Sequence, residues 1–190
     1  MHKAYGFTLV ELMVALAIVA ILASMAAPSF SHLMASTRVS GNVNGFLADL
    51  RYARSESIRR GGGVTLCRSD APEAANPACA GDAGPGSAGW ASGWIIFHDL
   101  DNDGEKGPTE PLLRVQSPIT AMNAIHDGNP MSSKFRFTAT GRLLTADAAT
   151  TLVFGAAPLF AINEQRTVCV NPGGRARIAG DGSAACGSGP

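Results

Sequence analysis

The chain has 190 residues, a formal net charge of zero, 22 glycines, 11 prolines and four cysteines. This length suits one domain of ordinary size with an appendage. Zero net charge excludes a global attraction to nucleic acid or to a membrane surface, so any such binding must come from a local patch. The sequence has no CxxC motif and its four histidines are scattered, which argues against a zinc site.

The N-terminus combines a short leader with a long apolar segment. Residues 1–6 end at a glycine, and Glu11 is the only ionisable residue in the following stretch of about 21 positions, which as a helix would cover roughly 30 Å, enough for a bilayer core. A secretory signal is cleaved after its apolar stretch, whereas cleavage after Gly6 would keep this helix on the mature protein. We therefore expect a leader at 1–6 and a transmembrane helix at 7–30.

Glu11 is the residue of this segment that requires an explanation. A carboxylate in hydrocarbon costs a few kcal/mol on insertion scales, which makes Glu11 a functional candidate. The alternative is that it lies near the interface and reaches water. Cleavage after Gly6 would create a charged α-amino group at Phe7, one helical turn away. We expect Glu11 of one subunit to neutralise this group on a neighbouring subunit and to set the register of assembly.

The segment Gly6-Phe7-Thr8-Leu9-Val10-Glu11-Leu12 resembles the class III signal of type IV pilins and type II secretion pseudopilins. The resemblance implies that a prepilin peptidase cuts after Gly6 and methylates Phe7, and that other pilins are partners of the N-terminal helix. It also implies a single-pass inner-membrane protein with a periplasmic head, which becomes extracellular once it is assembled in a pilus. The motif covers about the first 30 residues and identifies a superfamily rather than a member.

The rest of the chain predicts a stem helix followed by strands. Over 31–60, apolar residues recur at spacings of three and four, and three glycines follow. These residues are Leu33, Val39, Val43, Phe46, Leu47, Leu50, Ala53 and Ile58. Over 61–190, short runs rich in Val, Ile, Phe and Thr predict strands: Val64–Arg68, Gly93–His98, Leu112–Gln116, Lys134–Thr138, Thr151–Phe154 and Arg166–Val170. The expected fold class is α+β, with the apolar stripe of the stem packed on the antiparallel β-sheet of a small head.

The four cysteines allow three disulfide pairings, and disulfides in an oxidising compartment fit them better than a metal. We favour Cys67–Cys79 and Cys169–Cys186, because each pair would close a loop rich in Gly and Pro between strand-like segments. The segment 71–92, rich in small residues, is expected to be a long surface loop.

An acidic segment follows the second predicted strand. Asp99, Asp101, Asp103, Gly104 and Glu110 match the spacing D-x-[DN]-x-[DN]-G-x5-E of the EF-hand calcium loop. Hard carboxylate oxygens suit Ca²⁺, but the flanking segments are predicted strands rather than helices. The alternative is a solvated acidic hairpin loop. Ca²⁺ is the only cofactor that the sequence suggests.

The C-terminal segment contains Gly174-Arg175-Ala176-Arg177. In an extended chain the alternation sends both guanidinium groups to one side, and two such groups on a glycine-rich backbone suit phosphate contacts. Because no aromatic residue lies nearby to stack on bases, binding to nucleic acid should be independent of sequence and sensitive to salt. The alternative is a solvated hairpin whose arginines pair with Glu164 or Asp181.

This motif is similar to the DNA-binding tail of FimT minor pilins of naturally competent bacteria. Together with Gly93-Trp94-Ile95-Ile96-Phe97, it makes most of the chain resemble the FimT/GspH family. The resemblance implies a minor pilin that binds extracellular DNA through Gly174, Arg175 and Arg177 for uptake in natural transformation. The alternative is a structural pseudopilin of a type II secretion system without DNA binding. An enzyme is disfavoured, because no nucleophile or histidine has a recognisable catalytic setting.

Overall fold

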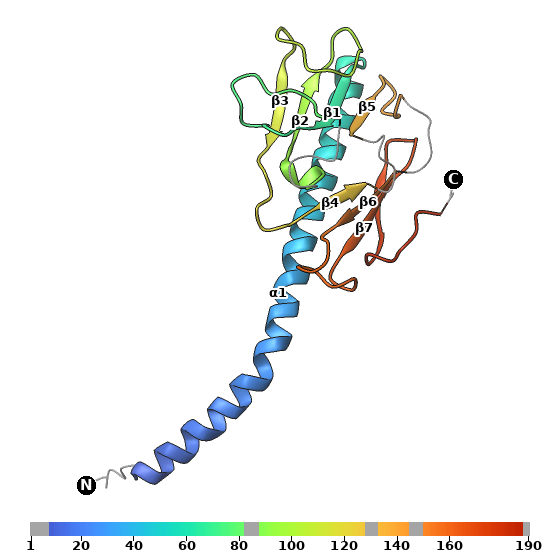
Figure 1. The fold of residues 1–190 in the computed structure, drawn as a ribbon. Helices are drawn as coiled ribbons and strands as arrows, with labels where there is room; N and C mark the ends of the chain where they lie inside the picture. The colour runs from blue at the N-terminus through green and yellow to red at the C-terminus, as the bar shows by residue number, and fades with distance from the viewer. Residues whose placement is uncertain (1–7, 82–87, 128–132, 145–149, 188–190) are drawn as a thin grey trace, which may run out of the picture. The chain divides into compact units, whose positions relative to one another are not determined.

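The computed structural model describes residues 8–81, 88–127, 133–144 and 150–187, apart from the side chains of 25–29 and Asp127. The chain divides into two units, Met1–Thr37 and Arg38–Pro190. Helix α1 (Leu9–Arg60) provides nearly all of the described part of the first unit and the first element of the second (Figure 1). One helix therefore covers both the expected membrane segment and the expected stem.

Helix α1 ends at the three glycines that follow Arg60. Gly62 has φ +119° and its amide donates to the Ser57 carbonyl at 2.7 Å, closing the last turn. Glycine adopts this positive φ without steric cost and often ends helices in this way. The helix stop expected from the sequence is therefore found where the glycines lie.

Two four-stranded antiparallel sheets follow α1 in the described residues of the second unit (Figure 1). The first has the order β3 (Leu112–Gln116), β2 (Trp94–His98), β1 (Val64–Arg68) and β5 (Lys134–Phe137). The second has the order β4 (Ile125–Asp127), β6 (Thr150–Phe154), β7 (Arg166–Val170) and β8 (Ala176–Gly180). The α+β class is confirmed. Strands β4 and β8 were not among the predicted strands, although the segment of β8 was expected to be extended, and three predicted strands differ from the observed ones by one residue at one end.

Phe46 of α1 lies at the centre of the core. Its ring makes edge contacts with Trp94 of β2 at 5.1 Å, with Phe154 of β6 at 5.5 Å and with Phe135 of β5 at 6.2 Å, so one side chain contacts both sheets. Such contacts stabilise beyond the area they bury. The buried stripe on α1 that surrounds it follows the predicted spacing: Val39, Val43, Leu47, Leu50 and Ala53. Two residues assigned to this stripe from sequence, Leu33 and Ile58, are exposed.

A buried polar contact fixes α1 against the first sheet. The Asp49 carboxylate accepts a hydrogen bond from the Trp94 indole at 2.8 Å and one from the Arg114 guanidinium at 2.5 Å. Arg114 also lies over the Tyr52 ring, 4.6 Å from its centroid. Because Asp49 is buried, these donors replace the water that its charge would otherwise require.

Both expected disulfides, Cys67–Cys79 and Cys169–Cys186, are present in the structure. Cys67 is fully buried beside Ile95 and Phe97 of β2. The segment 71–92 differs from the expected surface loop at its end, because Trp90 is only 2 % exposed and lies in the core in a short 3-10 helix, η2 (Trp90–Ser92). The glycines and alanines of this segment led to the prediction of a surface loop. The prediction did not take into account that Trp90, a large aromatic residue, would be buried.

Candidate nucleic-acid interface

The hairpin between β7 and β8 carries the two predicted arginines. The Gly174 amide donates to the Asn171 carbonyl at 2.9 Å, and the Asn171 amide donates to the Arg175 carbonyl at 2.9 Å. The Asn171 side-chain oxygen accepts from the Arg175 amide at 3.1 Å. These bonds form a closed turn, which Pro172 and two glycines allow. Arg175 therefore lies just before β8, and Arg177 lies within it.

The two arginine side chains are exposed and lie on one side of the strand. Arg177 is opposite Cys169 in the β7–β8 register, and Arg175 precedes it by two residues, so both extend from the face that carries Cys169. Within the described residues, neither guanidinium group has a hydrogen bond or an ion pair. Both charges are therefore available to an external anion.

The acidic partners considered for these arginines are engaged elsewhere. The Asp181 carboxylate accepts from the Ser183 hydroxyl at 2.6 Å and from its amide at 3.0 Å, and the hydroxyl is the main cause that lowers the pKa of Asp181. Glu164 accepts from the Ala161 amide at 2.8 Å. Among the described residues, the solvated hairpin whose arginines pair with Glu164 or Asp181 is therefore not formed.

The turn of this hairpin is held by contacts with Leu143 and with Arg54 of α1. The Leu143 amide donates to the Pro172 carbonyl at 3.0 Å, and the Arg54 guanidinium lies 3.5 Å from the Gly174 carbonyl oxygen. Gly174 is buried with φ +72°, and a Cβ there would collide with the Gly141 carbonyl oxygen. Gly174 thus permits a close approach of two backbones, and its predicted contact with DNA stays a prediction.

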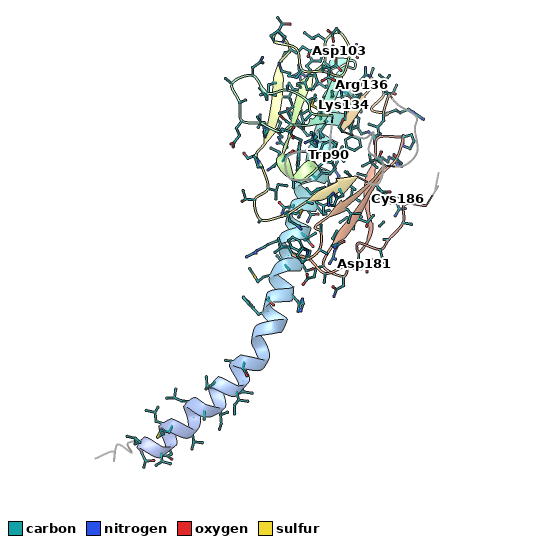
Figure 2. All side chains as sticks on the ribbon, in the orientation of Figure 1. Trp90, Asp103, Lys134, Arg136, Asp181 and Cys186 are labelled. Carbon is teal, nitrogen blue, oxygen red and sulfur yellow. A yellow bond between two sulfur atoms is a disulfide. The ribbon has the colours of Figure 1, made fainter. Side chains whose placement is uncertain are left out.

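Sequence reasoning missed one further cation beside this turn. Arg142 is exposed, and it lies between Gly141 and Leu143, the two residues that contact the hairpin. Its guanidinium group has no partner among the described residues. No spacing pattern relates position 142 to position 175, so only the fold could have identified it. The disulfide from Cys169 of β7 to Cys186, which Figure 2 labels, links the segment after β8 to β7.

The residues predicted to serve in processing and assembly lie at the N-terminus. Gly6 and Phe7 lie outside the described residues. Glu11 is exposed, and its Oε2 accepts from the Thr8 amide at 3.0 Å and the Thr8 hydroxyl at 3.1 Å. The Glu11 amide faces the Thr8 hydroxyl at 3.3 Å, which completes a capping box at the start of α1. This local role was not predicted, and the pairing of Glu11 with a neighbouring subunit stays a prediction.

Two further predictions concern the acidic loop and the N-terminal apolar segment. Asp99, Asp101 and Asp103 each offer a carboxylate oxygen within 4.8 Å of the others, whereas Glu110 is not in this cluster.

Among the described residues, no helix has both the length and the apolar character that a bilayer crossing requires. The span expected over 7–30 stays a prediction.

A long N-terminal helix whose second half packs on antiparallel sheets defines a pilin-like subunit, and the comparisons with known proteins agree. Residues 42–174 match the family described as type II transport protein GspH, and residues 1–27 match the prokaryotic N-terminal methylation motif. The chain therefore belongs to the GspH family. The match to GspH ends directly before Arg175.

A solved structure shares this fold. It is the type IV minor pilin FimU of Pseudomonas aeruginosa PAO1, with a TM-score of 0.57 and 17 % identity over 78 % of this chain and 93 % of that chain. The expected FimT/GspH resemblance is thus confirmed for fold and family, and the chain is a minor pilin or pseudopilin. Family and fold are those of structural pilins rather than enzymes.

Proposed function

We propose that the chain is a minor pilin of a type IV pilus whose head binds extracellular DNA through Arg175 and Arg177 for uptake in natural transformation. The observation that carries the proposal is a pair of exposed guanidinium groups on one face of a hairpin closed by a disulfide, neither of which has a partner in the described parts of the chain. A backbone already held in place loses little conformational freedom on binding, which favours affinity. Arg142, beside the same turn, adds a third positive charge.

The contacts are to phosphate rather than to bases. Within the described residues, no aromatic side chain lies in β8 or in the turn before it, so base stacking has no platform there. Guanidinium groups pair with phosphate oxygens through two parallel hydrogen bonds. Binding should therefore not depend on DNA sequence. With only two or three arginines per subunit, the affinity of one head should be low and should rise when several subunits share a filament.

The same proposal assigns roles to the N-terminus. A prepilin peptidase cuts after Gly6 and methylates Phe7, α1 anchors the subunit in the inner membrane, and Glu11 meets the α-amino group of a neighbouring pilin during assembly. The head is then periplasmic before assembly and extracellular in the pilus. Mass spectrometry of the mature subunit should find N-methylphenylalanine from Phe7 as its first residue, and a mature chain that begins elsewhere would contradict this assignment.

The DNA-binding assignment is tested by fluorescence anisotropy of labelled duplex DNA with the full chain in detergent micelles. Arg175→Ala combined with Arg177→Ala should abolish most of the binding. Arg38→Ala combined with Arg51→Ala is the matched control, since both are exposed arginines of α1 and the same charge is removed. Binding by the control should match that of the unmodified chain.

The alternative is a structural pseudopilin of a type II secretion system that does not bind DNA. The observation in its favour is the match of residues 42–174 to the type II transport family. The same experiment separates the two functions. If the unmodified chain does not bind DNA, or if both double variants bind equally, the DNA-binding pilin is wrong and the pseudopilin is favoured.

A further inference from the structure

The loop between β2 and β3 brings three carboxylates together. Asp99, Asp101 and Asp103 each place one oxygen atom within 4.8 Å of the other two. Asp101 and Asp103 are exposed, whereas Asp99 is buried at the base of the loop. Figure 2 labels Asp103 in this loop. Three negative charges at this separation repel each other, and a cation between them would remove the repulsion.

The buried carboxylate of Asp99 has one oxygen atom without a hydrogen-bond donor among the described residues. Asp99 is only 2 % exposed, and its Oδ2 accepts from the Thr65 hydroxyl at 2.9 Å and from the Gly104 amide at 3.0 Å. Its Oδ1 is shielded from solvent and has no hydrogen-bond donor among the described residues. A buried carboxylate oxygen without a donor is costly, since it has lost its water and gained no partner. Burial is the main cause that raises the pKa of Asp99, which the Thr65 hydroxyl opposes.

Glu110 holds the loop closed rather than joining the cluster. Its Oε1 accepts from the Leu100 amide at 2.6 Å, and its Oε2 accepts from the Gly107 amide at 2.8 Å. Both of its oxygens thus have backbone donors, and Glu110 lies outside the cluster of three aspartates; its role as the twelfth-position ligand of the EF-hand spacing stays a prediction. Its charge still reaches the site, since it raises the pKa of Asp99.

The basic residues beside the loop do not cancel this charge. Arg136 of β5 donates to the Asn102 carbonyl, and its positive charge lowers the pKa of Asp99. Lys134, on the same strand, pairs with Glu105 (Figure 2). Residues 99–110 carry five carboxylates and one lysine, Lys106, and the flanking strand adds Lys134 and Arg136, so five negative charges face three positive ones and the loop keeps a surplus of negative charge.

We propose that Asp99, Asp101 and Asp103 form a divalent-cation site, and that Ca²⁺ is the ion that fits it. All three donors are hard carboxylate oxygens, which favours calcium, magnesium or manganese over zinc or copper. Calcium accepts six to eight oxygens in irregular geometry, whereas magnesium requires a near-ideal octahedron and gives up its water reluctantly. A loop with three carboxylates and open coordination positions suits calcium better. The site is separate from the arginine hairpin, so the proposal does not rest on DNA binding.

The test is calorimetric titration of the full chain in detergent micelles with CaCl₂, after removal of metal with a chelator. We expect one site per chain with a Kd on the order of 10⁻⁴ to 10⁻³ M, the range of extracellular calcium modules. The same titration with MgCl₂ should give weaker binding. Calcium should also raise the thermal midpoint, because an ion that binds only the folded state stabilises it.

The variant Asp101→Asn combined with Asp103→Asn removes two charges and keeps the side-chain oxygens that accept from the Asp103 and Glu105 amides. It should therefore fold, and its Kd for calcium should rise by about tenfold or more because the ligand charge falls. Glu73→Gln, at an exposed position outside the loop, is the control and should bind calcium as the unmodified chain does. No heat and no change in thermal midpoint at millimolar calcium would overturn the site. An equal response from the double variant would overturn it as well.

Discussion

Replacing Gly174 by alanine should displace the turn that carries the arginines. Gly174 has φ +72°, where alanine is strained, and its Cβ would meet the Gly141 carbonyl oxygen and stand 3.1 Å from Cε1 of Phe137. Strain at such a residue costs about 1–3 kcal/mol, and overpacking against a fixed neighbour costs about 1–3 kcal/mol. The free energy of unfolding should therefore fall by about 2–6 kcal/mol.

The assay is denaturant unfolding of the fragment 38–190, which contains every buried hydrophobic residue of the described chain. Trp90 and Trp94 are 2 % and 1 % exposed, so their fluorescence reports loss of the core. Gly173→Ala is the control, because its φ lies outside the left-handed region and the nearest atom to an added Cβ is a side-chain oxygen, Asn171 Oδ1 at 3.2 Å, rather than a backbone atom. We expect it to lose less than about 1 kcal/mol. Equal losses in the two variants would refute the assigned role of Gly174.

Three further changes test the core, the disulfide and a charge pair. Phe46→Ala should lower the free energy of unfolding by about 3–5 kcal/mol in the same assay, and a loss below about 1 kcal/mol would show that Phe46 is not central. Cys169→Ala combined with Cys186→Ala should cost about 2–4 kcal/mol, and unchanged stability would contradict the disulfide. Glu56→Gln should cost at most about 1 kcal/mol at neutral pH. Arginine hydrogen bonds lower the pKa of Glu56 from 4.5, so its contribution is present above that pH and lost as pH falls through the folded-state pKa. A pH series of thermal midpoints in which the difference from the unmodified chain persists at acid pH would contradict this.

The elements whose signal is local could be predicted from the sequence. The spacing that buries Val43, Phe46 and Leu50 is a property of one helix, and the glycines that end α1 act within one turn. Most strands could be predicted because each is rich in Val, Ile, Phe or Thr and is bounded by turn residues. Strand β4 (Ile125–Asp127) has three residues and exists through its pairing with β6, so its own sequence gives little signal.

Contacts between distant segments could not be predicted from the sequence. The exposure of Arg175 and Arg177 agrees with their pattern, but the support of their turn by Gly141 and Leu143 depends on how β5 and the second sheet are placed. The EF-hand spacing grouped Glu110 with the three aspartates, and spacing does not show that two backbone amides donate to its oxygens or that it lies outside their cluster. Likewise Thr8, not named as a cap, holds Glu11 at the helix start.

The measurement that tests the central claim most directly is the salt dependence of DNA binding by the full chain in detergent micelles. If Arg175 and Arg177 each neutralise one phosphate, the slope of log K against log salt should be less steep by about 1.8 in the Arg175→Ala and Arg177→Ala double variant, at about 0.9 per phosphate of duplex DNA. The Arg38→Ala and Arg51→Ala control should keep the slope of the unmodified chain. Identical slopes in all three proteins would contradict the claim that the arginine hairpin binds DNA.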